Sequence, residues 1–239
     1  MLKVQNLHKH FGGVKAVKDC SFEVKPHLIT ALIGPNGAGK STVFNLISGI
    51  LKPESGKIIF NNIDITNLSV ERISNLGISR LFQQSRLFNN LTVKENLLLA
   101  LDNEDTKFWK NLAGLNPITQ EKETKIKKML KLVAMESFEN NLARDLSYGQ
   151  KRLIELGRTI LNPHILLMLD EPVAGVNPKL RENIAKILVG FKDEGKTILL
   201  IEHDMSFTLK IADIVIVMDE GRVIAEGKPE EIKNNPQVL

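Results

Sequence analysis

The chain has 239 residues, of which 43% are hydrophobic and 25% are charged. This composition is typical of a globular protein, and the length is sufficient to bury a substantial core. The net charge of +4 comes from scattered lysines and is too small to indicate nucleic acid or anionic lipid as a partner. We expect one domain that contains an inserted lobe.

Cys20 is the single cysteine, so the chain cannot form an internal disulfide. The N-terminal segment MLKVQNLHKH carries charge where a secretory signal would carry an apolar run, which favours a reducing cytoplasm. The longest apolar runs, such as residues 165–169 and 214–218, are far shorter than the roughly 20 residues needed to cross a bilayer. Any role at a membrane must therefore come through a partner.

Short apolar runs alternate with segments of helical periodicity, which indicates an α/β fold with a mostly parallel core sheet. Residues 2–11 and 20–24 are predicted to be antiparallel strands. An apolar strand is expected at residues 28–33, and a second strand-rich segment includes residues 57–60. Later strands are predicted at the following positions: residues 165–169, 197–201 and 214–218, with a helix after Pro178.

The inserted lobe begins at residue 92, where the sequence becomes helical as far as about residue 135. Thr92 and Glu95 predict a capping box at its start. The second helix of the lobe is amphipathic, with its apolar and basic residues largely on different faces. The apolar face carries Ile126, Met129, Leu130 and Val133, and the lysines are Lys125, Lys127, Lys128 and Lys131. No basic binding site is expected there.

The segment GPNGAGKST, residues 34–42, follows a predicted strand and begins a predicted helix, which is the context of a P-loop. Its glycines let successive amides face a phosphate group, and the helix N-terminus adds its positive dipole end. Lys40 is expected to reach the β- and γ-phosphates, and the Ser41 hydroxyl to bind Mg²⁺. The alternative is a glycine-rich turn with no ligand. The predicted nucleotide-binding residues are Gly34, Pro35, Asn36, Gly37, Ala38, Gly39, Lys40, Ser41 and Thr42.

Two acidic residues, Asp170 and Glu171, follow the continuously apolar run at residues 165–169. Ligands of open α/β sheets bind at the carboxyl ends of such strands. We expect Asp170 to hold Mg²⁺, directly or through water, and Glu171 to polarise the attacking water. The alternative is that the two acids merely begin a turn, which Pro172 would suit.

The segment LSYGQ, residues 146–150, begins a helix that is predicted to reach about residue 161. Ser147 and Gln150 fit a capping box, which alone would explain the segment without a ligand. Together with the two preceding motifs, however, it resembles the LSGGQ signature of the ATP-binding cassette (ABC) ATPases. In that family the serine and backbone amides of one subunit's signature face the γ-phosphate on the P-loop of another, which implicates Ser147 and Gly149.

The resemblance spans nearly the whole chain and implies a P-loop ABC cassette. Residues 1–91 and 162–239 would form a RecA-like core with an antiparallel β subdomain, and residues 92–161 would form a helical subdomain with the signature.

Three further positions match motifs of the family. Phe11 stands where an aromatic residue stacks on adenine, although a core phenylalanine fits the sequence nearly as well. Gln83 resembles the Q-loop glutamine that senses Mg²⁺ and water and couples to the membrane subunit, with the adjacent Gln84 as the alternative. His203 resembles the switch histidine that contacts the γ-phosphate, and with Lys40, Gln83 and Glu171 it completes the expected catalytic set.

Two positions depart from the family pattern: Tyr148 replaces the usual first glycine of the signature, and Asn177 stands where aspartate is frequent. Asn177 with Pro178 also suits a helix N-terminus. The segments FQQSRLF, LSYGQ, DEPVAGVNP and IEHDM, with the ending GKPEEIKNNPQVL, resemble the ATPases of branched-chain amino acid importers. That subfamily usually continues a few residues beyond the position of Leu239.

The resemblance implies an ATP hydrolase that binds ATP and Mg²⁺ and acts at the cytoplasmic face of the inner membrane. It implies a homodimer, or a heterodimer with a related ATPase, joined to transmembrane permease subunits and an extracytoplasmic substrate-binding protein, with no nucleic acid. The permease is expected beside Gln83, with Arg86, Leu87 and Phe88 as candidate contacts, although the apolar pair could equally be core.

Other functions remain open. One alternative is the ATPase of a lipopolysaccharide or lipid exporter, whose motifs are close to these. A second is an ABC ATPase of DNA repair or translation, but such proteins usually join two cassettes in one chain or carry a long coiled coil. A binding module without turnover would be expected to lack a carboxylate at the position of Glu171.

Overall fold

The computed structural model describes residues 1–81, 87–101 and 119–238. They form two compact units. The first unit comprises Met1–Arg80, His164–Glu171 and Leu188–Leu239, and the second comprises Leu81–Pro163 and Pro172–Ile187. The subdomain boundaries expected near residues 92 and 161 remain a prediction. Within the described parts of the chain, none of the helices has both the length and the apolar character that crossing a bilayer requires.

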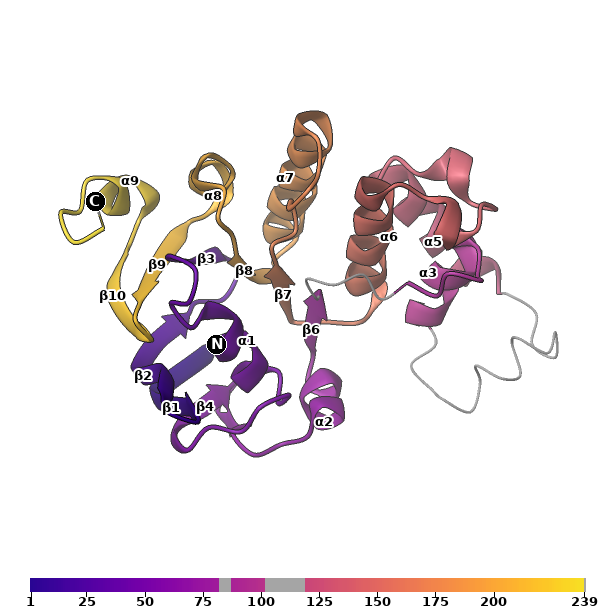
Figure 1. The fold of residues 1–239 in the computed structure, drawn as a ribbon. Helices are drawn as coiled ribbons and strands as arrows, with labels where there is room; N and C mark the ends of the chain where they lie inside the picture. Colours follow the sequence, from indigo (N-terminus) through magenta and orange to yellow (C-terminus); the bar gives the residue numbers. More distant parts are fainter. Residues whose placement is uncertain (82–86, 102–118, 239) are drawn as a thin grey trace. The chain divides into compact units, whose positions relative to one another are not determined.

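An antiparallel sheet in the first unit contains four strands in the order β2-β1-β4-β5 (Figure 1). They are β1 (Leu2–Phe11), β2 (Val14–Val24), β4 (Ser55–Phe60) and β5 (Ile63–Asp64). Strand β2 begins six residues before the predicted strand at residue 20, because its first half pairs with β1 through the backbone, while apolar and polar residues are mixed there and Val17 is its one buried side chain. The apolar pattern of a strand starts only near Cys20.

The second sheet of this unit has the order β10-β9-β3-β8-β7-β6. Its strands are β3 (Ile29–Ile33), β6 (Ile78–Leu81), β7 (Leu166–Asp170), β8 (Thr197–Ile201), β9 (Ile214–Asp219) and β10 (Arg222–Gly227). Strands β3, β7 and β8 are buried along their whole length, as expected for parallel strands that are covered on both faces. This confirms the predicted α/β fold.

The antiparallel edge strand β10 has no counterpart in the sequence analysis. Its residues alternate between exposed and half-buried positions, and its apolar run is only three residues long, 223–225. It pairs with β9 across a turn in which Glu220 and Gly221 both have positive φ, 42° and 82°. Such a turn matches the twist of a two-stranded ribbon, and the Glu-Gly pair was the signal that could have revealed it.

The core of the first unit lies between these sheets and helix α1 (Lys40–Ile47). Phe44 and Ile47 of α1 are fully buried, as are Phe60 of the antiparallel sheet and Leu199 of β8.

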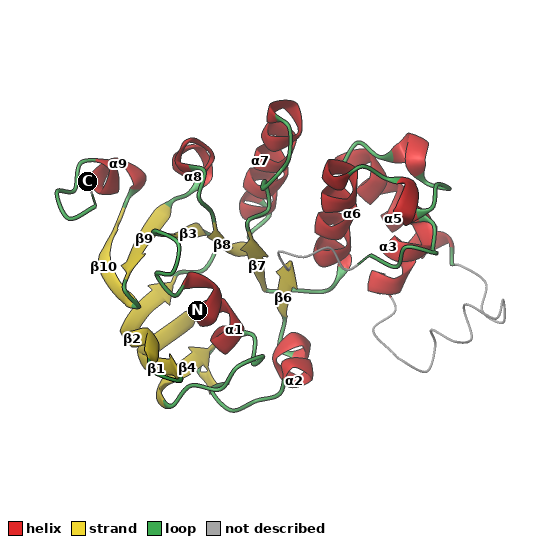
Figure 2. Cartoon of the chain, viewed as in Figure 1, coloured by secondary structure: helices red, strands yellow, loops and turns green. Residues whose placement is uncertain are grey.

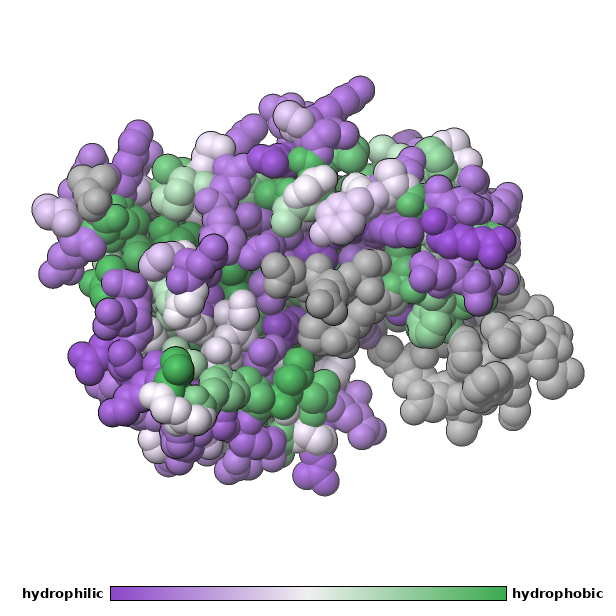
Figure 3. Space-filling model, viewed as in Figure 1, coloured by the Kyte–Doolittle hydropathy of each residue, from purple (hydrophilic) through white to green (hydrophobic). Residues whose placement is uncertain are grey.

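The remaining helices wholly within this unit are α2 (Val70–Asn75), α8 (Met205–Ile211) and α9 (Pro229–Lys233). The surface seen in Figure 3 is mostly hydrophilic with small hydrophobic groups.

The second unit is helical (Figure 2). It contains α3 (Val93–Leu101), α5 (Gln120–Leu132), the short 3-10 helices η1 (Glu136–Phe138) and η2 (Ala143–Asp145), and α6 (Tyr148–Leu161). Helix α7 (Pro178–Asp193) begins in this unit and ends in the first. The capping box between Thr92 and Glu95 is present. Ile126, Met129 and Leu130 of α5 are buried, as is Val133 directly after its end, and the four lysines are exposed, as expected.

Burial of Cys20 leads to a test of the first unit's core. Its side chain is fully buried, and burial together with the nearby Asp19 raises the thiol pKa from 9.0 to about 12. We expect the folded protein to resist a thiol reagent at pH 8, because reaction requires an exposed thiolate. The neutral thiol stabilises the fold fully below the unfolded-state pKa, and this contribution is lost as the pH rises toward 12. Labelling of Cys20 should therefore coincide with unfolding in urea, and complete labelling before the unfolding transition would contradict the described core.

Candidate nucleotide-binding site

Parallel pairing brings three segments to one edge of the second sheet. Leu32 of β3 pairs with Ile201 of β8, and Ile201 also pairs with Asp170 of β7. The loop after β3, the residues after β7 and the residues after β8 therefore leave the sheet at the same level. Candidate phosphate, metal and catalytic residues from all three strands are thereby placed together.

The loop between β3 and α1 depends on glycine at two close approaches. Gly34 has φ 145°, and a Cβ atom there would lie 2.0 Å from the Met218 carbonyl oxygen. Gly39 has φ 96°, and a Cβ there would lie 2.3 Å from the Ala16 carbonyl oxygen. Because backbone atoms cause both clashes, no rotamer change relieves them, and only glycine permits this path. The loop is thus held against β9 and the β1–β2 hairpin.

Pro35, Asn36 and Gly37 form the exposed outer turn of this loop, with Ala38 buried beneath it. Helix α1 starts immediately after Gly39, whose cap position contributes no side-chain hydrogen bond. A helix N-terminus with exposed preceding amides is a binding site for anions.

Lys40 is almost completely buried, with its Nζ donating hydrogen bonds to the carbonyl oxygens of Gly34 and Pro35, both at 2.8 Å. Burial lowers the pKa of Lys40, while the charges of Glu171 and Asp170 oppose that shift. The lysine is therefore held inside the loop by carbonyl groups near two carboxylates. Ser41 is exposed on the first turn of α1, and Thr42 is half-buried.

Asp170 ends β7 and is buried, with its Oδ2 atom 3.1 Å from Nη2 of Arg80. Arg80 lies on β6, and sequence reasoning did not identify it. The signal available was a basic residue in a short strand that begins and ends with the apolar residues Ile78 and Leu81. A cation is needed at this place because a buried carboxylate is costly unless it is paired.

Glu171 adopts the left-handed backbone conformation, with φ 49°, and its amide donates to the Ile201 carbonyl oxygen at 3.0 Å. Such a conformation is uncommon for residues other than glycine and is frequent at functional sites. Its Oε1 atom lies 2.8 Å from Nε2 of His203. Glu171 does begin a turn, as the alternative interpretation held, but its side chain also contacts the predicted switch histidine.

Phe11 is 47% exposed at the end of β1, so the interpretation as a core phenylalanine is wrong. The Nζ of Lys9 lies 5.5 Å from the centre of its ring. An exposed aromatic ring is available for stacking, as adenine recognition requires. Gln83, Gln84 and Arg86 lie outside the described residues.

The signature segment belongs to the second unit. Ser147 is exposed and caps α6: its Oγ accepts from the Gln150 amide at 3.3 Å, and Gln150 Oε1 accepts from the Ser147 amide at 2.9 Å. The predicted capping box is therefore present. Gly149 is half-buried and follows Tyr148, which is 54% exposed. The Tyr148 ring lies close to Gly175: a Cβ atom added to Gly175 would be 2.8 Å from the Cε1 atom of Tyr148. Tyr148 thus contacts the loop that precedes α7.

Asn177 accepts a hydrogen bond at Oδ1 from the Leu180 amide at 3.0 Å. This is the geometry of an N-cap before a helix that begins with proline, so the structural role expected for Asn177 is present.

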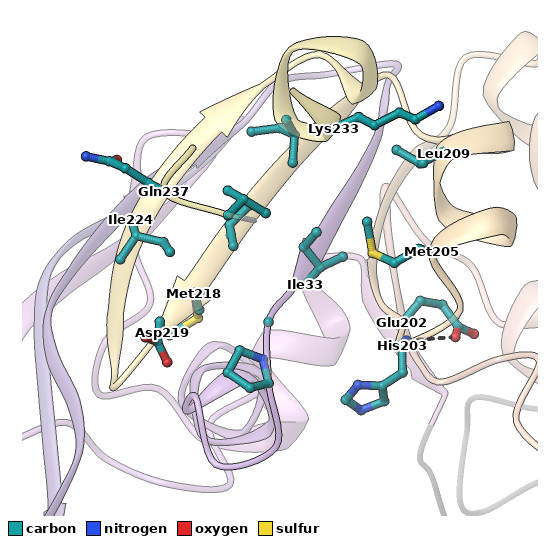
Figure 4. A pocket seen from close by; sticks show the side chains of 15 residues that line it. Ile33, Glu202, His203, Met205, Leu209, Met218, Asp219, Ile224, Lys233 and Gln237 are labelled. Carbon is teal, nitrogen blue, oxygen red and sulfur yellow. Dashed lines mark hydrogen bonds between the residues drawn. The ribbon is translucent and has the colours of Figure 1, made fainter. Parts of the chain in front are cut away.

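A pocket of about 650 Å³ lies next to the P-loop in the first unit (Figure 4). Ile33, Met205 and Ile224 contribute to its apolar lining, and Gly34 and Pro35 of the loop line it together with His203. The backbone amide of His203 donates to Oε2 of the buried Glu202 at 3.2 Å. The hydrogen bond to Glu202 therefore holds the backbone of His203, while the ring nitrogen Nε2 contacts Glu171.

The donor set at this edge fits Mg²⁺. Ser41 offers a hydroxyl oxygen and Asp170 a carboxylate oxygen, and Mg²⁺ prefers such hard oxygen ligands. The metal is commonly bound through one or two carboxylates and the phosphates of a nucleotide, so few protein ligands are needed.

A P-loop after a buried strand, with two acids and a histidine at neighbouring strand ends, defines a class of nucleotide-binding α/β protein. Comparison with known proteins narrows the class. Residues 17–174 match the family described as ABC transporter, and residues 222–239 match the family described as branched-chain amino acid ATP-binding cassette transporter. The chain belongs to the ABC transporter family and is an ATP-binding, ATP-hydrolysing cassette, which confirms that part of the sequence analysis.

Among its relatives, a probable branched-chain amino acid transport ATP-binding protein of Archaeoglobus fulgidus is 39% identical, with 100% of this chain and 93% of that protein covered. A high-affinity branched-chain amino acid transport ATP-binding protein of Escherichia coli K12 is 36% identical, with 100% and 96% covered.

Solved structures agree with the fold. A nucleotide-free ATP-binding cassette from an ABC transporter has a TM-score of 0.85 and 36% identity, with 100% of this chain and 96% of that chain covered. A dimeric cassette bound to ADP and Pi has a TM-score of 0.82 and 26% identity, with 96% and 99% covered.

The close approach at Gly39 provides a test of the loop. We expect Gly39→Ala to weaken ATP binding by about tenfold or more, equivalent to ~1.4 kcal/mol, because the added methyl group must move the loop away from Ala16. Gly190→Ala is the matched control, since Gly190 lies in α7 with open space around its Cα. This control should bind ATP as the parent protein does. Equal ATP affinities of all three proteins in a titration would refute the role of this close approach.

Proposed function

We propose that this chain is the ATP-hydrolysing subunit of an importer of branched-chain amino acids. The observation that carries the hydrolytic part is the 2.8 Å contact between Glu171 and His203 at the strand edge that also bears the P-loop. The proposed cargo is supported by the names of the full-length relatives and by the family matched at residues 222–239.

In the proposed site the loop amides and Lys40 bind the phosphates of ATP, and the exposed ring of Phe11 stacks on adenine. Lys40 would exchange its two carbonyl partners for phosphate oxygens, which offer a stronger charged interaction. Ser41 and Asp170 would hold Mg²⁺, with Gln83 as a further proposed ligand. The bound metal supplies neutralisation of charge on the phosphate oxygens.

Glu171 is the proposed group that orients and polarises the attacking water, and His203 is proposed to hold the Glu171 carboxylate and contact the γ-phosphate. The contact between their side chains restrains both groups, and the Glu171 backbone is fixed by its hydrogen bond to Ile201. Catalysis then depends mainly on positioning and electrostatic stabilisation, as is usual for phosphoryl transfer.

The proposed active species is a dimer, either of this chain or with a related ATPase, in which Ser147 and Gly149 of one subunit face ATP on the other. Ser147 is exposed at the N-terminus of α6, where the helix dipole favours an anion. The solved cassette that is dimeric and bound to ADP and Pi supports a dimer.

The proposed location is the cytoplasmic face of the inner membrane, bound to permease subunits that work with an extracytoplasmic substrate-binding protein. Phe88 is 52% exposed and is a candidate permease contact, with the Arg158 guanidinium 5.4 Å from the centre of its ring. Leu87 is only 8% exposed and is therefore a core residue, as the alternative interpretation held. The buried Asn96 orders this segment, because its Nδ2 atom donates to the Phe88 carbonyl at 3.1 Å and its Oδ1 atom accepts from the Phe88 amide at 2.9 Å.

The role of Glu171 is tested by Glu171→Gln. This variant should bind ATP normally and lose about 10²–10⁴-fold in turnover, because the amide cannot accept a proton from water. Glu194→Gln removes an exposed carboxylate from a turn of the first unit and should leave phosphate release unchanged. Undiminished phosphate release by the Glu171 variant would exclude it as the catalytic base.

The transport assignment is tested by purifying the tagged protein from membranes and identifying its partners by mass spectrometry. We expect a permease and a receptor that binds amino acids. The same complex in proteoliposomes should accumulate leucine only with ATP. Association with nucleic acid or ribosomes, or ATP-dependent export of lipid, would refute the proposal.

A further inference from the structure

Arg80 joins three elements of the first unit through its guanidinium group. Its Nη1 atom donates to Oδ1 of Asn45 at 2.8 Å and to Oγ of Ser48 at 2.7 Å, and both acceptors belong to the C-terminal end of α1. Its Nη2 atom donates to Oδ2 of Asp170 at 3.1 Å. The group also lies over the Phe44 ring, with its Cζ atom 5.5 Å from the ring centre. The side chains of Arg80 and Asp170 are only 8% and 4% exposed.

These contacts fix Asp170 relative to α1. The planar guanidinium presents its donors in a rigid arrangement, so two hydrogen bonds to α1 determine the direction of the third. The same helix carries Lys40 and Ser41 on its first turn. Arg80 therefore ties a carboxylate at the end of β7 to the helix whose other end bears the phosphate and metal ligands.

We propose that Arg80 is a positioning residue for the magnesium–nucleotide site. By holding Oδ2 of Asp170, it sets the plane of the carboxylate and its separation from Ser41, so that the metal finds both ligands already oriented. Residues that orient metal ligands in this way commonly change metal affinity by about 10–100-fold when they are replaced. This inference rests on the proposed binding of Mg²⁺ by Ser41 and Asp170.

The test compares the affinity of the purified full-length protein for ADP in the presence of Mg²⁺ with that in the presence of a chelator. ADP is used because it is not hydrolysed, and the ratio of the two affinities isolates the contribution of the metal. Arg80→Gln should reduce this ratio by about tenfold while the affinity for metal-free ADP is retained. Arg80→Lys keeps the positive charge but lacks the rigid fork, so it should fold and still lose most of the ratio.

Asn45→Ala provides a milder variant, should the loss of the buried cation in Arg80→Gln prevent folding. It removes one of the two acceptors on α1 and should lower the ratio by about two- to fivefold, the effect of one hydrogen bond. Arg152→Lys is the matched control. Arg152 forms a similarly buried ion pair with Glu155 at 3.3 Å in the second unit, with side chains 2% and 7% exposed. Its replacement should leave the ratio unchanged.

The outcomes separate this inference from the proposed magnesium site. If Mg²⁺ fails to strengthen ADP binding by the parent protein, or if Asp170→Asn leaves the ratio intact, the magnesium site itself is wrong. If the parent protein shows the metal effect and Arg80→Lys retains it in full, charge alone suffices and positioning by Arg80 is refuted. A parallel fall in both affinities would show that Arg80 serves only the stability of the fold.

Discussion

Parallel pairing of β3, β8 and β7 is the constraint on which the candidate site depends. The pairing of Leu32 with Ile201 and of Ile201 with Asp170 sets the level at which three chain segments leave the sheet. Because parallel strands all end at the same edge, their pairing alone brings together residues that are separated by more than a hundred positions in sequence. A shift of one residue in β7 would reverse the faces of its side chains and remove Asp170 from Arg80.

Close backbone packing then shapes what this edge can bind. Gly34 and Gly39 let the P-loop lie against Met218 and Ala16, which leaves no room for another side chain at either position. Burial disfavours the charged form of Lys40, and the nearby Glu171 and Asp170 compensate for part of that cost. The site therefore combines a cation, an anion-binding helix end and acidic groups, which together suit a metal-bound nucleotide.

Much of this arrangement could be predicted from the sequence because short, local motifs indicate it. A glycine-rich loop, an apolar strand that ends in two acids, and the capping boxes at Thr92 and Ser147 are all short patterns with a direct physical meaning. Arg80 escaped prediction because its partners, Asn45 and Asp170, are distant in sequence and only the sheet brings them near. For the same reason, neither the exposure of Phe11 nor the contact between Tyr148 and Gly175 could be predicted from the sequence. Strand β10 was missed because it lies at the edge of the sheet and its apolar run is only three residues long.

In the proposed dimer, a complete ATP site combines the P-loop of one subunit with the signature of another. Mixing two inactive variants, Lys40→Ala and Ser147→Arg, measures this most directly. A mixed dimer of these variants contains one site with both an intact P-loop and an intact signature, whereas neither homodimer contains any. We expect each folded variant to be inactive alone and phosphate release to return when the two are mixed. A mixture that stays inactive although mixed dimers form, or full activity of Ser147→Arg alone, would contradict it.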